Sequence, residues 1–446
     1  MKKTIIRQIL ALSFIAFSSC LLTAQSAKEL ISEIKSLMLE RYIFLDQAKA
    51  VIAQLEQLEE QQHFEQYTTA EELAEAMTQA MRSISNDKHL GVLPPRSTVQ
   101  EKPNEFKPSY RNVISRYSNP MIPSFQYIGT SVGYFDMRYF GGGERNYDKI
   151  DAVMTQLKEV DALIVDLRSN GGGSPRTVQY LCSYFFDEHK LLSSLYSRFD
   201  DHTDEYWIVE VKGQKRPKLP IFVLTSSRTF SGAEDFAYTM QAHGKATVIG
   251  EVTRGGAHPT RAHNLSGGFR VRIPFARSIH PVTKSNWEGI GVQPDVQVAR
   301  EDALEKAKEL AAEAAEAYKQ SYFGTLEKAL GEITGPLLSE TAARKVYDLL
   351  ANIVNYNLVN ENDINRLGYQ YLRGGKKLAA LALLKANSQL FPESPNVYDS
   401  YAEVLVAVGD HQQAITNLKI AVDLAIKTQH PDLEYFQRNL TALAEN

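Results

Sequence analysis

Cysteine is scarce in this 446-residue chain, which holds only Cys20 and Cys182. Cys20 lies in the apolar leader described below, so a mature chain would keep Cys182 alone and could form no internal disulfide. A chain of this length can bury enough apolar surface to fold without such links. Cys182 stands within the apolar run 178–186, and we therefore expect it to be a small core hydrophobe rather than a catalytic thiol.

The chain also lacks a strong charge of either sign, since its formal net charge is −4 and it has no lysine- or arginine-rich run. That balance argues against a nucleic-acid partner. It has no H-E-x-x-H motif and no Cys/His cluster, which argues against a zinc site, and no metal or organic cofactor is implied. Beyond the leader, no apolar run is long enough to predict a transmembrane span.

The first residues have the layout of a secretory signal peptide. Two lysines and an arginine precede the apolar run 9–17, and small residues follow up to Ala24. We predict a signal peptide over residues 1–24, cleaved after Ala24, and an exported protein that is periplasmic or extracellular. Lipid attachment at Cys20 is an alternative, although Phe17 stands where such sites usually have leucine. A buried N-terminal helix is the remaining reading.

The full sequence is 43% hydrophobic and 23% charged, which is typical of a globular protein with two or three domains. Residues 25–95 predict an N-terminal helical unit, because apolar residues recur at helical spacing in two segments. Thr69 with Glu72 predicts a capping box at the start of the second segment. The unit ends near Pro94 and Pro95.

Residues 96–300 predict an α/β domain, because strand and helix patterns alternate there. The predicted strands are residues 132–140, 162–166, 221–225, 246–250 and 268–276. The predicted helices are residues 147–158, 177–186 and 232–243.

Residues 301–446 predict a helical tail with an internal period of 34. Five positions recur at that spacing: Gly368, Tyr371, Gly375, Ala380 and Leu384 correspond to Ala402, Leu405, Gly409, Ala414 and Leu418. Thirty-four is the tetratricopeptide period. The simpler alternative is a plain bundle of helical hairpins, since two repeats are fewer than such arrays need. A groove over residues 360–430 could bind a peptide, a protein partner or a second subunit.

Ser231 is the first candidate for chemistry. A buried strand ends at Thr225, a short polar turn follows, and a helix begins after Ser231. A serine there lies at the positive end of the helix dipole, and the N–H of Gly232 points to the same place, which suits a tetrahedral oxyanion. The alternative is structural, because Ser231 with Glu234 also forms a capping-box pattern.

A second candidate is the glycine-rich turn at residues 166–173, where an apolar strand runs into three glycines and then a helix. Backbone donors at such a turn bind anions. The turn matches neither G-x-G-x-x-G nor G-K-[ST], so a second oxyanion donor fits better than a phosphate cradle. A flexible turn without function is the alternative.

A serine nucleophile needs a base. Among the ten histidines, five lie near these segments: His89, His243, His258, His263 and His280. Spacing cannot choose among them, because such sites are assembled in space.

Four motifs occur in order, at residues 166–173, 225–234, 250–259 and 286–295. Together they resemble the tail-specific, or C-terminal-processing, serine protease family, in the branch that includes the tricorn core and the modules of interphotoreceptor retinoid-binding protein. The resemblance covers residues 28–305. It implies a crotonase-like core of stacked β-β-α units.

The resemblance also implies roles, position by position. Ser231 matches the nucleophile and His89 the histidine base carried on the N-terminal unit. Glu288 matches the glutamate that supports the site. Gly172 and Gly232 match the oxyanion positions, with Gly173 as an alternative to Gly172, and His258 is the reserve base.

Two departures from the family limit what carries over. The Thr-x-Gly turn at residues 253–255 is followed by no lysine, so a Ser-Lys dyad is disfavoured and a histidine-assisted site is favoured. Arg254 cannot substitute, because it stays protonated. About 35 residues separate Pro95 from Ser131, too few for a PDZ domain, so we do not expect selection of C-terminal tails by that route.

The sequence therefore predicts an exported serine endopeptidase that hydrolyses short or unfolded polypeptides. The rival from another class is a non-catalytic binding module for apolar ligands or peptides on the same scaffold. The joint presence of Ser231, His89 and Glu288 favours the enzyme, because a carrier needs none of them.

Overall fold

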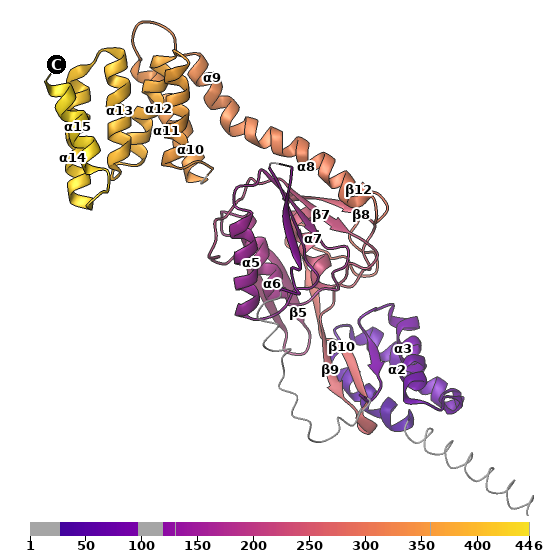
Figure 1. Ribbon diagram of the computed structural model, residues 1–446. Helices are drawn as coiled ribbons and strands as arrows, with labels where there is room; N and C mark the ends of the chain where they lie inside the picture. The colour runs from indigo at the N-terminus through magenta and orange to yellow at the C-terminus, as the bar shows by residue number, and fades with distance from the viewer. Residues whose placement is uncertain (1–26, 97–118, 130, 357, 446) are drawn as a thin grey trace, which may run out of the picture. The chain divides into compact units, whose positions relative to one another are not determined.

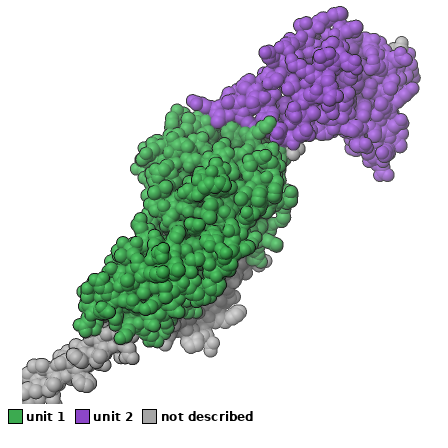
Figure 2. Space-filling model, turned by 180° about the vertical axis from the view of Figure 1, so that it is seen from behind, with its two compact units in different colours: residues 1–312 green, residues 313–446 purple. Residues whose placement is uncertain are grey.

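The computed structural model describes the chain apart from residues 1–26, 97–118, 130, 357 and 446. The expected signal peptide and Cys20 therefore lie outside the described residues. The chain divides into two compact units, Met1–Ala312 and Glu313–Asn446 (Figure 2). No helix in the described part is long and apolar enough to cross a bilayer.

A six-stranded sheet forms the centre of the first unit, in the order β12-β8-β7-β4-β3-β2. Its strands are β2 (Ser124–Ile128), β3 (Val132–Asp136), β4 (Ala162–Asp166), β7 (Ile221–Thr225), β8 (Ala246–Gly250) and β12 (Val296–Gln297). All neighbours pair in parallel except β2, which lies antiparallel to β3 at the edge. Strands β3, β4 and β7 are buried throughout, as expected for parallel strands covered on both faces.

Three helices follow strands of this sheet: α5 (Glu144–Gln156), α6 (Pro175–Cys182) and α7 (Gly232–Ala242). Cys182 is fully buried beside the apolar side chains of the core, as predicted. A separate antiparallel sheet has the order β11-β5-β6, with β5 at Leu191–Ser197, β6 at His202–Trp207 and β11 at Ala276–Ile279. The α/β reading of this region is confirmed.

The N-terminal part of unit 1 is a helical layer with its own apolar cluster. Its labelled helices are α2 (Leu45–Glu60) and α3 (Ala70–Ser85), after a first helix at residues 27–41. The predicted capping box is present: the Glu72 N–H donates to Thr69 Oγ1 at 3.2 Å, and the Thr69 N–H donates to Glu72 Oε2 at 3.2 Å. Asn86, in the left-handed region with φ 53°, ends α3.

The predicted core strand at residues 268–276 is wrong as a single strand. Residues Arg270–Pro274 form β10, which pairs with β1 (Gly91–Leu93) and β9 (Thr260–Asn264) beside α2 and α3 (Figure 1). Residues after Phe275 form β11 in another sheet. The alternate side chains Val271 and Ile273 are fully buried in the N-terminal cluster, and their burial there fixes the hairpin to the N-terminal layer.

The second unit is helical, and helix α8 (Ala303–Lys319) runs across the division between the units. The following helices are α9 (Thr325–Gly331), α10 (Glu340–Asn355), α11 (Glu361–Arg373), α12 (Lys377–Leu390), α13 (Pro395–Val408), α14 (His411–Thr428) and α15 (Leu433–Ala444). Helices α11 and α12, and likewise α13 and α14, pack as neighbours (Figure 1). The helical reading of the tail is confirmed.

The hairpin's attachment to the helical layer predicts the effect of one substitution. Ile273→Ala should lower the free energy of unfolding of unit 1 by about 2–5 kcal/mol, since it leaves a cavity at a fully buried site. Both tryptophans of the chain, Trp207 and Trp287, lie in this unit, so urea unfolding followed by tryptophan fluorescence reports on it alone. The control Ile84→Ala, at a residue that is 40% exposed, should change the free energy of unfolding little. Equal effects of the two substitutions would contradict the burial of Ile273 in the N-terminal cluster.

Candidate active site

Ser231 occupies a strained turn between β7 and α7. Its φ of 56° and ψ of −121° place a non-glycine residue in a disfavoured region, and such strain persists only where the surroundings impose it. The turn is tied to the end of β4 by two hydroxyls. Ser226 Oγ donates to the Arg168 carbonyl at 2.7 Å, and Thr229 Oγ1 donates to the Leu167 carbonyl at 2.8 Å.

Glu234 holds the turn from the inside. Its carboxylate is fully buried. One oxygen accepts the N–H of Ser231 at 2.7 Å and the N–H of Gly256 at 2.9 Å. The other accepts the N–H of Gly255 at 2.6 Å and the hydroxyl of Thr253 at 2.5 Å. Burial raises the pKa of Glu234, while these hydrogen bonds oppose the rise. The sequence had indicated only a helix cap here.

The glycine turn lies against Ser231, and its Gly172 and Gly173 amides differ in their hydrogen bonding. The N–H of Gly172 donates to Asn170 Oδ1 at 2.8 Å, so it is not free for a substrate. A Cβ on Gly172 would lie 2.8 Å from the Cβ of Ser231, so this glycine allows the two turns to touch. Gly173 and Gly232 line one cleft with Ser231, and the described residues provide no acceptor for the N–H of either. The Gly172 N–H, expected at an oxyanion position, is thus engaged by Asn170, whereas the alternative, Gly173, has an amide without a partner among the described residues.

His89 lies in the same cleft as Ser231. Its ring stacks on Phe230 with 4.4 Å between centroids, and its backbone N–H donates to Asp87 Oδ1 at 2.9 Å. Nδ1 is buried and has no hydrogen-bond partner among the described residues. Burial lowers the pKa of His89 to about 4, so the imidazole is neutral at physiological pH. Within the described chain no hydrogen bond joins His89 to Ser231.

Glu288 lies beside His258 and not beside His89. His258 Nδ1 is 3.3 Å from Asp87 Oδ2 and 3.4 Å from Glu288 Oε2. Glu288 Oε2 also accepts the N–H of Ala257, and burial raises the pKa of Glu288. Glu288 therefore reaches His89 only indirectly, through His258 and Asp87. Glu288, which the resemblance expects to support the site, thus contacts His258 in this geometry.

The trio of Asp87, His258 and Glu288 is also a grouping that could hold a metal ion, since its ligand atoms lie within 4.8 Å of one another. The same distances fit an imidazole held between two carboxylates. Tyr42, fully buried, donates its hydroxyl to Asp87 Oδ2 at 3.3 Å. His258 faces a neighbouring pocket lined by Tyr42 and Glu288 and not the Ser231 cleft.

The cleft has a volume of about 510 Å³. Three of the elements around it are the turn before α7, the glycine turn and the segment after α3. The side chains that line it besides those already named include Leu195, Asp204, Tyr206, Asp235, Arg261, Phe275 and Trp287. It is thus an open cleft with apolar walls, one candidate nucleophile and two uncommitted backbone amides.

The sequence matches two family models. Residues 131–298 match peptidase family S41, and residues 18–122 match the N-terminal domain of peptidase S41 in eukaryotic IRBP. Residues 131–298 are therefore similar to peptidase family S41, which confirms the resemblance drawn from the four motifs. The chain is homologous to carboxyl-terminal-processing serine proteases.

Curated relatives include the carboxy-terminal processing protease CtpB of Bacillus subtilis, 22% identical over 177 residues, and the carboxyl-terminal-processing protease of Synechocystis, 27% identical over 169 residues. The matches cover 39% and 37% of this chain and only 35% and 38% of those relatives. Similar solved structures include the photosystem II D1 C-terminal processing protease, with 16% identity and a TM-score of 0.42 over 65% of this chain and 98% of that one. The tricorn protease shows 13% identity and a TM-score of 0.45 over 66% of this chain and 37% of that one.

The four hydrogen bonds of Glu234 predict that its charge is needed for the fold of the site. Glu234→Gln replaces one acceptor by an amide donor facing other donors. We expect the free energy of unfolding to fall by about 2–4 kcal/mol, since buried N–H or O–H groups lose their partner. Urea unfolding measures this. The control Glu251→Gln changes an acid that accepts the N–H of the exposed Ser227. An equally large fall in the free energy of unfolding of this control would contradict the structural role assigned to Glu234.

Proposed function

We propose that this chain is an exported serine endopeptidase that hydrolyses peptide bonds in short or unfolded polypeptides. The observation that carries the proposal is the cleft shared by Ser231, His89, Gly173 and Gly232. Ser231 stands in a strained turn at a helix start, and the two amides have no partner within the described chain. This arrangement offers a nucleophile, a neutral base and donors for an oxyanion.

In the proposed reaction, Ser231 Oγ forms a bond to the substrate carbonyl carbon while the imidazole of His89 takes up the hydroxyl proton. The protonated imidazole then gives that proton to the leaving amine as the C–N bond breaks. Water then attacks the carbonyl carbon of the resulting ester while His89 takes up a proton from the water. His89 gives that proton to Ser231 Oγ as the ester bond breaks. His89 has to close the remaining separation to Ser231 in the substrate complex, and such hydrogen bonds commonly tighten only there.

The amides of Gly173 and Gly232 would stabilise the negative oxygen of the tetrahedral intermediate. They lie close together, since a Cβ on Gly232 would be 3.0 Å from the Gly173 nitrogen. Losing one such donor typically lowers the rate on the order of 100-fold or more. The N-terminus of α7 adds the positive end of its dipole at the same place.

The acids around His258 are assigned a positioning role. Asp87 accepts the backbone N–H of His89 through Oδ1 and contacts His258 through Oδ2. Glu288 holds His258 from the other side. This chain of contacts connects Glu288 to the loop that carries His89, which gives Glu288 an indirect function in place of direct contact with the base.

The finer fold assignments are proposals of the same kind. The stacked parallel strands and helices around α6 and α7 support a crotonase-like core. The tail supports a tetratricopeptide-like reading, because helices α11 and α13 begin 34 residues apart, at Glu361 and Pro395. The second helices begin at Lys377 and His411, again 34 residues apart. A Cβ on Gly368 would lie 2.6 Å from Leu384, so the repeated small residue allows close helix packing.

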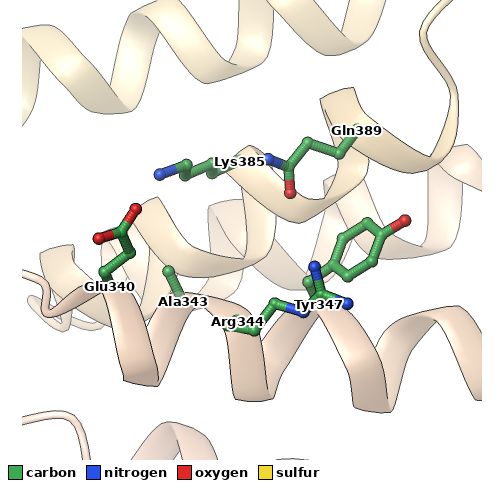
Figure 3. A pocket seen from close by; sticks show the side chains of 6 residues that line it. All are labelled: Glu340, Ala343, Arg344, Tyr347, Lys385 and Gln389. Carbon is green, nitrogen blue, oxygen red and sulfur yellow. The ribbon is translucent and has the colours of Figure 1, made fainter.

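Export and a tail partner complete the proposal. Export rests on the leader-like pattern of residues 1–24. A partner rests on the tail's helical repeats, which also carry a pocket of about 390 Å³ between α10 and α12. In Figure 3 side chains of both helices, among them Arg344, Tyr347 and Lys385, surround this pocket. Its polar and charged lining suits a peptide better than an apolar ligand.

The enzyme reading predicts that two substitutions abolish activity. Ser231→Ala and His89→Ala should each lower kcat/KM at least about 10³-fold, because nucleophile and base act as a unit. Cleavage of casein and of a peptide library by the purified chain without its first 24 residues measures this. The controls are Ser227→Ala, at an exposed serine of the same turn, and His63→Ala on the N-terminal layer.

Two outcomes would change the assignment. Activity that survives Ser231→Ala would show that Ser231 is not the nucleophile. A wild-type chain that cleaves no peptide and takes up no fluorophosphonate probe, while remaining folded, would favour the non-catalytic binding module.

The buried state of His89 predicts an unusual pH profile. The base must be neutral to accept a proton, and the pKa of His89 is lowered to about 4 by burial. Activity should therefore rise with pH through about 4 and be nearly complete by about pH 5, since kcat/KM reports the free enzyme. Initial rates with a substrate of uncharged side chains between pH 3.5 and 8 test this. An acid limb near the ordinary histidine value of about 6.5 would contradict it.

A further inference from the structure

Asp235 is an acidic side chain inside the Ser231 cleft that the proposed mechanism does not use. It is only 9% exposed. Among the described residues its carboxylate has a single hydrogen bond, from the Thr239 hydroxyl at the long distance of 3.4 Å. A buried carboxyl group with so little compensation is costly to ionise. Burial accordingly raises the pKa of Asp235 to about 7.

Asp235 has a defined position relative to the nucleophile. Its backbone N–H donates to the Ser231 carbonyl at 2.9 Å, so it stands one turn of α7 beyond Ser231. One helical turn rises about 5.4 Å along the axis, so the two backbone positions are close. Both residues line the same cleft. The Asp235 side chain and the candidate nucleophile are therefore lining residues of one cleft, joined through the first turn of α7.

Part of the cleft's lining is apolar. Leu195, Phe275 and Trp287 line the cleft, and Trp287 is almost fully buried. The cleft's one guanidinium, Arg261, lies over the ring of Phe275, 4.4 Å from its centroid, and makes no ion pair with Asp235 within the described chain. A second acid, Asp204, also lines the cleft, but its side chain is 64% exposed.

We propose that Asp235 selects substrates whose residue on the acyl side of the cleaved bond carries a cationic side chain, lysine or arginine. This inference rests on the proposed peptidase function. The four-carbon stem of lysine can lie along the apolar walls while its ammonium group reaches the carboxyl group. The pairing supplies the partner that the carboxylate lacks in the free protein.

An apolar residue of the same length would leave the acid unpaired, and an acidic residue would meet a like charge. The test therefore compares lysine with norleucine, which has a similar stem and no charge. In peptides that differ only at this position, lysine should exceed norleucine in kcat/KM at least about 10-fold at pH 8, because one substrate alone satisfies the buried group.

The preference should also depend on pH. Cys182 of α6 and Tyr206 of β6 face Asp235, and burial raises the pKa of both, so neither is charged between pH 6 and 8. His89 is already neutral in that range. Asp204 and Arg261 line the cleft as well, and the Asp204 variant below separates that contribution. The lysine-to-norleucine ratio should therefore rise between pH 6 and 8 as Asp235 loses its proton.

The decisive variant is Asp235→Asn, which keeps the shape of the side chain and removes its charge. The ratio should fall to within about 3-fold of unity and lose its pH dependence, while norleucine peptides are still cleaved. Asp204→Asn, at the exposed acid of the same cleft, is the matched control and should keep most of the preference. Equal cleavage of lysine and norleucine by the wild type, or a preference that persists in Asp235→Asn, would overturn the inference.

A binding measurement separates this inference from the proposed function. Acetylated peptides that end in lysine or norleucine can be titrated into the Ser231→Ala chain by calorimetry, with no cleavage required. Lysine should bind at least about 10-fold more tightly, and the advantage should disappear in the Ser231→Ala, Asp235→Asn double variant. Equal binding of both peptides would exclude Asp235 as the selecting group even if the wild type proves to be a peptidase.

Discussion

The buried carboxylate of Glu234 is the interaction on which the rest of the site depends. It receives four hydrogen bonds from two segments: the Ser231 amide on one side, and Thr253, Gly255 and Gly256 on the other. A buried charge is tolerated only when it is fully satisfied in this way. The strained backbone of Ser231 is thereby tied to the segment that also carries His258. The position of the nucleophile and the positions of the supporting groups are consequences of one network.

Much of the core could be predicted from the sequence, and the reason is local. Strands β4, β7 and β8 have the bounds that their apolar runs predicted, because a strand buried on both faces is a continuous hydrophobic segment. Strand β6 went unpredicted, since residues His202–Trp207 are largely polar and exposed. The prediction for residues 268–276 failed for another reason. The apolar alternation is present, but no nearby residue indicates that Val271 and Ile273 pack against the helices near the N-terminus.

The sequence predicted which residues belong to the site better than it predicted which of them contact one another. The strand–turn–helix pattern made Ser231 a candidate, the motif resemblance chose His89 among the histidines, and both line one cleft. Three adjacent glycines give no indication of which amide faces that cleft; the side chain of Asn170 decides it by engaging Gly172. Likewise, nothing in the spacing of Asp87, His258 and Glu288 shows that they meet. Asp235, next to the recognised motif, could have been noticed only as an acid following a helix cap.

The pairing of β1 with β10 has a consequence for when this protein can act. His89 stands directly before β1, and β1 is held by residues Arg270–Pro274, which come far later in the chain. The Glu234 network likewise needs residues up to Gly256, and Val292 donates its N–H to Thr253 Oγ1. A nascent polypeptide therefore lacks a complete site until about residue 292 has been synthesised and has folded back onto the earlier segments. The order of synthesis therefore delays the assembly of the site until the chain is nearly two-thirds made.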